Sequence, residues 1–97
     1  MICEIKKVLE FDTYLLKSKS GEYKQMIELY GLDKLNVGDR IKIDKRLLSQ
    51  TSQSYTQPYA FELVDNAQVK LINKNNEAEY IGVEKGDKKY LLKRVYG

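Results

Sequence analysis

The side chains that most often carry out catalysis are absent from this sequence or isolated in it. There is no histidine, and the single cysteine is Cys3. Acid–base catalysis near neutral pH most often uses histidine, and a nucleophilic cysteine needs a neighbouring base. Cys3 alternates with Ile5 on a mainly apolar face, so we expect it to be a small core residue. A conventional zinc site needs several Cys or His ligands. We therefore expect no enzyme activity, no metal and no cofactor.

Tyrosine is the residue type that could instead bind a partner, since the chain has eight tyrosines and two phenylalanines. Its ring is apolar and its hydroxyl is polar, which suits a binding surface. On a β-surface, tyrosines can stack on bases while lysine and arginine hold phosphates. The candidates for such contacts are Tyr14, Tyr23, Lys24, Arg40, Lys42, Tyr90, Lys93 and Arg94. The alternative is that most tyrosines fill a small core with their hydroxyls at its rim, above all Tyr23, Tyr59, Tyr80 and Tyr90.

The charge pattern gives limited support to nucleic-acid binding. The chain has 17 basic and 14 acidic residues, a net charge of +3, whereas dedicated nucleic-acid binders usually show a stronger excess. Most of the excess lies in residues 85–97, where Asp87 is the one acidic residue. Strand alternation would place Lys93 and Arg94 on opposite faces. The alternative is a solvated edge strand on which lysines prevent aggregation.

The N-terminal third predicts strands. Residues 2–11 alternate, with one face formed by Cys3, Ile5, Leu9 and Phe11 and interrupted by Lys7, which indicates a half-buried strand. A turn at residues 12–13 leads to a returning strand at 14–17. Residues 22–30 fit a helix between Ser20 and Gly31, or a strand paired with 14–17 around Gly21. We favour the strand; a helix there would make the fold α+β.

The remaining chain predicts further short strands. Val-Gly-Asp at 37–39 is a tight turn, after which Ile41 and Ile43 alternate with charged residues. A helical turn at 44–48 leads into a Ser/Thr/Gln-rich loop at 49–58 and a strand at 59–63. Residues 65–79 are mostly polar and could hold a short strand or helix. Residues 80–84 and 89–96 predict a C-terminal hairpin.

Residues 1–64 resemble the strand order of an oligonucleotide/oligosaccharide-binding (OB) barrel. The resemblance depends on the 14–29 hairpin and on the 37–43 segment, which is similar to a strand entry common in OB and SH3-like barrels. The whole chain also resembles a group of small single-domain proteins from low-GC Gram-positive bacteria whose C-terminal hairpin ends like residues 90–97. That resemblance implies fold and length, and no activity. We expect one all-β domain: a five-stranded OB-like barrel with an additional hairpin at 80–97.

These observations favour a non-catalytic protein-interaction or assembly module, acting on an unknown protein partner or by self-association. The alternative is an OB-type protein that binds single-stranded nucleic acid, with an affinity sensitive to salt and to Arg40, Lys42, Tyr90 and Arg94. No apolar run is long enough to span a membrane, and residues 1–7 lack the order of a signal peptide. We expect a cytoplasmic protein that does not bind membranes.

Overall fold

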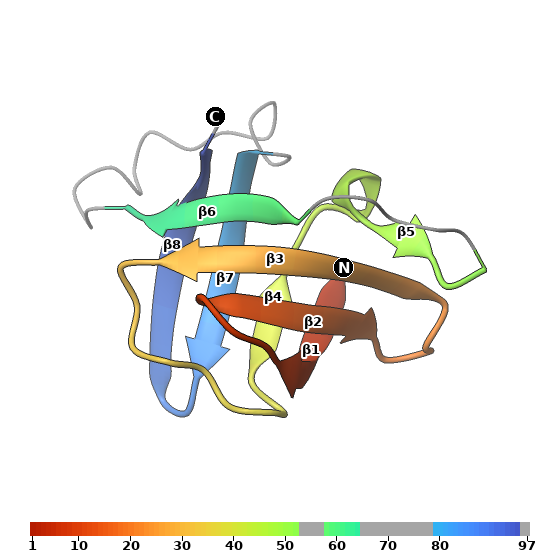
Figure 1. Cartoon of the computed structure of the whole chain (residues 1–97), viewed down its shortest axis with the longest axis horizontal. Helices are drawn as coiled ribbons and strands as arrows, with labels where there is room; N and C mark the ends of the chain where they lie inside the picture. Colours follow the sequence, from red (N-terminus) through yellow and green to blue (C-terminus); the bar gives the residue numbers. More distant parts are fainter. Residues whose placement is uncertain (53–57, 65–78, 96–97) are drawn as a thin grey trace.

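The computed structural model describes residues 1–52, 58–64 and 79–95 (Figure 1). Its strands are β1 (Ile2–Val8), β2 (Thr13–Ser18), β3 (Tyr23–Tyr30), β4 (Arg40–Lys42), β5 (Ser49–Gln50), β6 (Tyr59–Leu63), β7 (Tyr80–Lys85) and β8 (Lys88–Val95), with one 3₁₀ turn, η1 (Lys45–Leu47). The prediction of an all-β fold is confirmed. The expectations for 53–57 and 65–78 lie outside the described residues. No helix in the described part has the length and apolar character needed to cross a membrane.

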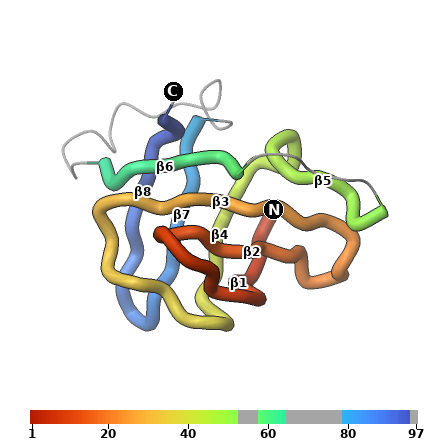
Figure 2. The backbone as a smooth tube through the Cα atoms, viewed as in Figure 1, coloured from red at the N-terminus to blue at the C-terminus, as the bar shows by residue number. Residues whose placement is uncertain are grey.

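Seven of the described strands form a closed barrel. Their order is β2-β1-β4-β7-β8-β6-β3, and β3 pairs back with β2. The prediction of a barrel is confirmed, but its wall has seven strands instead of five. The C-terminal hairpin, β7 and β8, forms part of the barrel wall between β4 and β6 (Figure 2). It is not an addition to a barrel that is already complete. Closure is a physical advantage because a closed sheet presents no unpaired edge to other chains.

A β-bulge alters the predicted pattern of the first strand. The pairing of β1 with β2 shifts register between Ile5 and Lys7. Cys3 and Ile5 are buried as expected, but beyond the shift Val8 packs against the core. The prediction that Phe11 continues the buried face is wrong: β1 ends at Val8, and Phe11 is 87% exposed in the following turn. The bulge explains Val8, because one extra residue in a strand inverts the alternation beyond it. Phe11 is exposed because the strand has already ended and residues 11 and 12 form the turn.

Residues 23–30 form a strand, so the helical alternative is excluded. Along β3, Gln25, Ile27 and Leu29 point into the barrel and are buried. The hairpin with β2 turns at Gly21, whose φ of +77° favours glycine. The buried Ser18 hydroxyl accepts a hydrogen bond of 3.0 Å from the backbone N–H of Tyr23. This bond fixes the register in which the β3 side chains enter the core.

The core lies inside the barrel and draws on every strand of its wall. Phe61 is fully buried, and the parallel pairing of β6 with β3 sets it opposite Leu29. Cys3 is fully buried, which confirms its core assignment, and burial raises the pKa of its thiol. Tyr14 is 2% exposed, and its hydroxyl accepts a hydrogen bond of 3.0 Å from the backbone N–H of Leu35. That bond ties the segment between β3 and β4 to the core.

We predict that Tyr14→Phe lowers the free energy of unfolding by about 1–3 kcal/mol, because the buried amide of Leu35 loses its acceptor. Urea denaturation followed by circular dichroism measures the change. Tyr30→Phe is the matched control: the Tyr30 hydroxyl also donates a hydrogen bond, to Glu28, but its ring is exposed. We expect the control to change stability by less than about 0.5 kcal/mol. Equal losses in the two variants would contradict the proposed role of the buried bond.

Candidate interaction surfaces

The eight residues suggested by sequence for base and phosphate contacts do not form one surface. Tyr14 is in the core, so its ring is not presented to a ligand. Arg40 and Lys42 lie on the outer face of β4, and Lys24 lies two strands beyond β1, on β3. Tyr90, Lys93 and Arg94 belong to β8, where alternation separates Lys93 from the other two.

Arg40 belongs to a row of charged residues that crosses the outer wall. Its guanidinium forms an ion pair of 3.0 Å with the Glu84 carboxylate. Cross-strand register places six charged residues in successive opposed pairs over β3, β2, β1, β4, β7 and β8: Lys24, Lys17, Glu4, Arg40, Glu84 and Lys89. From Lys17 to Lys89 the charges alternate in sign, and opposite charges facing each other across strands stabilise a sheet modestly, whereas Lys24 and Lys17 are like charges. The charge of Arg40 therefore already has a structural role, which is to pair with Glu84 across the barrel wall.

Two of the predicted residues, Tyr23 and Arg94, form cation–aromatic pairs with partners outside the set of eight candidates. The Lys45 ammonium lies 5.0 Å from the centroid of the Tyr23 ring. The Arg94 guanidinium lies 4.2 Å from the centroid of the Tyr59 ring. Tyr23 is on β3 and is paired with β5, and Tyr59 is on β6, which pairs with β3 further along the same edge. Lys45 had no distinguishing sequence signal. Tyr59 was expected to be a core residue, and its ring does pack against the core, but its pairing with Arg94 joins residues far apart in the chain.

Tyr90 and Lys93 have surroundings that differ in charge. The half-buried Tyr90 packs against the core and lines a polar pocket that also contains three aspartates and two lysines: Asp33, Asp39, Asp87, Lys85 and Lys88. With one more carboxylate than ammonium group, this pocket has no excess of positive charge to attract a phosphate. Lys93 is exposed and lies opposite Tyr80 on one side and Glu62 on the other.

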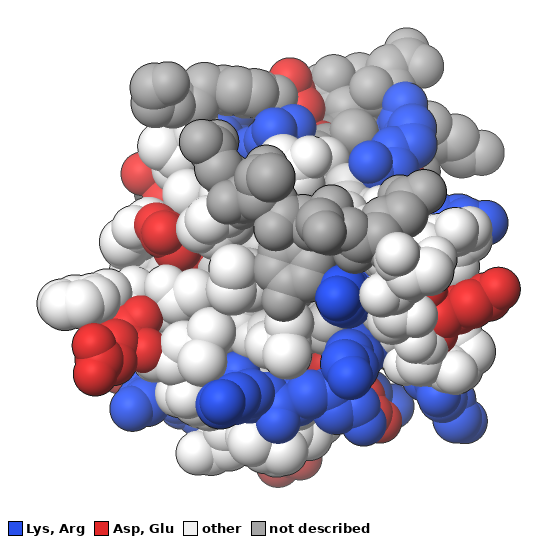
Figure 3. All heavy atoms as spheres, turned by 45° about the vertical axis from the view of Figure 1, so that its right-hand side comes forward, with Lys and Arg blue, Asp and Glu red and all other residues white. Residues whose placement is uncertain are grey.

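Figure 3 shows that basic side chains gather in a band across the lower half of one face, with acidic ones at its margins.

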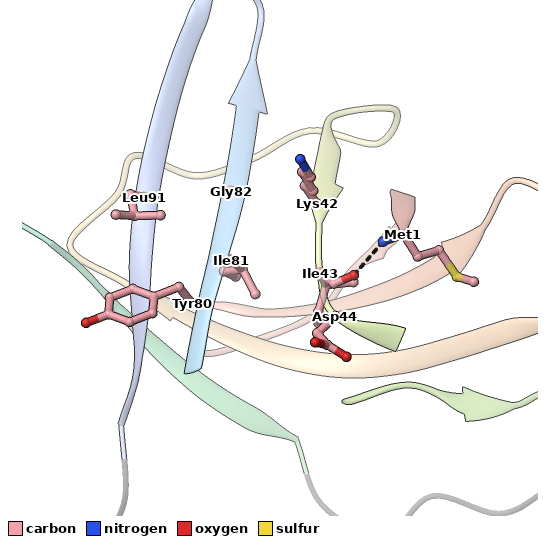
Figure 4. A pocket seen from close by; sticks show the side chains of 8 residues that line it. All are labelled: Met1, Lys42, Ile43, Asp44, Tyr80, Ile81, Gly82 and Leu91. Atoms are coloured by element: carbon pink, nitrogen blue, oxygen red, sulfur yellow. Dashed lines mark hydrogen bonds between the residues drawn. The ribbon is translucent and has the colours of Figure 1, made fainter. Parts of the chain in front are cut away.

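A shallow groove lies on the outer wall where β4 meets β7, and we name it the Gly82 groove. Its volume is about 290 Å³, and it is lined by Met1, Lys42, Ile43, Asp44, Tyr80, Ile81, Gly82 and Leu91 (Figure 4). Cross-strand register sets Gly82 between Lys42 and Leu91. Because glycine has no side chain, the row is interrupted at this point and the groove is open. Its lining is mostly apolar, with Lys42 and Asp44 as charged members.

The carboxylate of Asp44 is held in place at the margin of this groove. It accepts hydrogen bonds from the backbone N–H of Arg46 at 2.8 Å and from its guanidinium at 2.8 and 3.0 Å. These bonds lower the pKa of Asp44 from 3.8 to about 2. The same contacts make Asp44 the N-cap of η1, which carries the buried Leu47.

Three exposed apolar residues belong to the end of the barrel where β2 begins and where β3 and β6 end, and Figure 1 shows these strand ends on the same side of the barrel. Phe11 is 87% exposed, Leu63 42% and Tyr30 41%, and we name these three residues the hairpin-tip patch. Tyr30 is paired with Glu62, the neighbour of Leu63. The backbone N–H of Leu29 donates a hydrogen bond of 3.0 Å to the Asp12 carbonyl, which fastens the turn between β1 and β2 to β3.

The backbone at this turn is in a conformation that its residues disfavour. Phe11 has a φ of 57° and Asp12 a φ of 59°. Two successive left-handed residues are typical of tight hairpin turns, but asparagine and glycine usually occupy them. A bulky side chain at such an angle is an outlier. The sequence predicts a turn at residues 12–13, one residue later than the left-handed pair at 11 and 12.

No known protein family, curated protein or solved structure matches this chain. The fold and its surfaces therefore define the class directly: a small closed β-barrel with an open groove on its wall and an exposed apolar patch at one end. The structure supports the barrel part of the resemblance to OB-like and SH3-like proteins. No comparison supports the narrower resemblance to a group from low-GC Gram-positive bacteria.

We predict that Asp44 contributes stability that is lost on acidification. Its pKa is lower in the folded protein, so the contribution is present above about pH 4 and disappears as the pH falls towards 2. Asp44→Asn should therefore be less stable than the wild type at pH 6, with a difference that shrinks by pH 2. Urea unfolding across this range measures it, and Arg46→Gln should lose part of the same pH dependence. A difference that stays constant from pH 6 to 2 would contradict the assignment.

Proposed function

We propose that this protein is a non-catalytic protein-interaction module that binds its partner through the hairpin-tip patch. The observation that carries the proposal is Phe11, a large apolar side chain that is almost fully exposed and held at a positive φ. An exposed apolar patch with a polar rim is typical of an interaction site. Single-cysteine composition suits a reducing compartment, and we place the protein in the cytoplasm.

The energetics of Phe11 favour a role outside the folded monomer. A left-handed conformation costs a non-glycine residue about 1–2 kcal/mol. The ring is exposed, so its burial does not offset this cost within the chain. On a partner, burying such a side chain would contribute about 1.5–3 kcal/mol. A phenylalanine that disfavours folding but suits binding is expected at a position where the residue is selected for function.

The charges around the patch indicate what kind of partner would fit. Glu10 and Asp12 flank Phe11 in the turn, and Glu28 and Glu62 lie beside Tyr30 on β3 and β6. A partner surface should therefore combine an apolar pocket for the ring with basic residues at its rim. The same carboxylates disfavour nucleic acid as the ligand of this patch, because they would repel phosphates.

We predict that Phe11→Asn separates binding from folding. Asparagine tolerates the left-handed region, so the variant should be as stable as the wild type or up to about 1 kcal/mol more stable. Its binding should fall, which is measured by photo-crosslinking of tagged protein in cytoplasmic extract. The control is Val37→Ser, which removes an apolar side chain that is 64% exposed but outside the patch. Equal crosslinking by the wild type and Phe11→Asn would contradict the proposal, and so would its absence in both.

A second candidate function is binding of single-stranded nucleic acid, and it is favoured by a different observation. Tyr23 with Lys45 and Tyr59 with Arg94 pair an aromatic ring with a cation along one edge of β3. Aromatic side chains and basic residues that alternate along a groove are the usual means of binding single strands. These four residues replace the wider set suggested by sequence as the candidates for this function.

We predict salt-dependent binding if this alternative is correct. Fluorescence anisotropy with labelled mixed-sequence single-stranded DNA and RNA at two salt concentrations measures it. If the pairs bind bases, affinity should fall with salt, and Tyr59→Leu should weaken binding by about 1–3 kcal/mol through lost stacking. Tyr80→Leu is the matched control, because Tyr80 has no such cation partner among the described contacts. Absence of binding at low salt would remove this function for generic single strands.

A further inference from the structure

The Gly82 groove has the size and lining to receive one aromatic ring. A closed apolar cavity of about 150 Å³ is enough to bind benzene in another protein. The groove measures about 290 Å³ and is open to solvent. Tyr80 and Leu91 stand beside the gap above Gly82, and Figure 4 shows the Tyr80 ring on one side of it and Lys42 on the other. Aromatic rings pack well edge to face, so Tyr80 suits a phenyl ring in particular.

The charges beside the groove are complementary to those beside Phe11. Lys42 lines the groove, and Lys93 lies opposite Tyr80 on β8. Two nearby carboxylates are already paired, Asp44 with Arg46 at 2.8 Å and Glu84 with Arg40 at 3.0 Å, and Glu62 lies opposite Lys93 on the side away from Tyr80. The turn that presents Phe11 carries Glu10 and Asp12 instead. Opposite charges around two matched surfaces favour the correct partner and orientation.

We propose that the Gly82 groove receives Phe11 of a second copy of this chain. This inference rests on the proposed function of the hairpin-tip patch and names its partner. Phe11 lies in the turn between β1 and β2, whereas the groove lies where β4 meets β7, so the two copies use different surfaces. Such a head-to-tail contact leaves one groove and one Phe11 unused in every pair. Copies therefore add in series until a ring closes or a filament extends.

Two variants remove one half of the contact each. Phe11→Asn removes the ring and keeps the groove. Gly82→Leu fills the groove and keeps the ring. Gly82 has no left-handed φ, and a Cβ there would meet the Lys42 Cβ at 3.7 Å, an ordinary contact, so the backbone accommodates the substitution. Gly82→Ala is the matched control, because a single methyl group leaves most of the groove open.

Sedimentation velocity from about 10 µM to about 1 mM tests the proposal. The wild type and Gly82→Ala should form dimers, trimers and larger species as concentration rises. Phe11→Asn and Gly82→Leu should each lose about tenfold to a hundredfold in association constant, because the ring is no longer buried. An equimolar mixture of these two variants should form dimers and stop there, since it contains one intact ring and one intact groove per pair.

Three results would overturn the inference: a wild type that stays monomeric throughout, a mixture of the variants that stays monomeric, or a Phe11→Asn variant that assembles like the wild type. The proposed function is tested separately by crosslinking in extract. A monomeric wild type that still crosslinks to another protein through Phe11 would refute self-association and leave the interaction module in place. A wild type that neither self-associates nor crosslinks through Phe11 in extract would refute both the self-association and the interaction module.

Discussion

The parallel pairing of β3 with β6 is the contact on which the rest of the barrel depends. It is the parallel pairing in a sheet whose other described pairings are antiparallel, and it sets Ile27 opposite Tyr59 and Leu29 opposite Phe61. Through it the N-terminal strands and the C-terminal hairpin enclose one core. The same pairing brings the ends of β3 and β6 together. It therefore brings Tyr30 and Leu63 to the same end of the barrel, with Tyr30 paired to Glu62 and Leu63 on the opposite face of the sheet.

A closed wall decides which of its outer residues are available for binding. In the row that contains Arg40 and Glu84, residues of opposite charge on neighbouring strands face one another from Lys17 to Lys89. These pairs stabilise the wall, so their charges are less available to recognise a partner. The places that differ are those where a row is interrupted or a strand ends. Gly82 interrupts one row and opens a groove, and the turn after β1 ends another and exposes Phe11.

The candidate residues show what the alternation of residues along a strand predicts and what it cannot predict. Alternation correctly separated Lys93 from Arg94, and it correctly placed Arg40 and Lys42 outside while Ile41 went inside. It could not show that Arg94 covers Tyr59 or that Lys45 covers Tyr23, since each pair joins different strands. Tyr14 shows the opposite error: tyrosine can serve a surface or a core, and a single buried amide, that of Leu35, accounts for its hydroxyl.

The sequence by itself determined the all-β class, the strand nature of most segments, the core role of Cys3 and the hairpin at the C-terminus. These follow from local period and turn residues, which act over a few positions. Only the tertiary structure decided that the hairpin completes the wall, that the turn after β1 exposes Phe11 and that Gly82 opens a groove. The physical reason is that strand order, register and closure depend on pairings between distant segments, and one inserted residue in a strand inverts which side chains face the core.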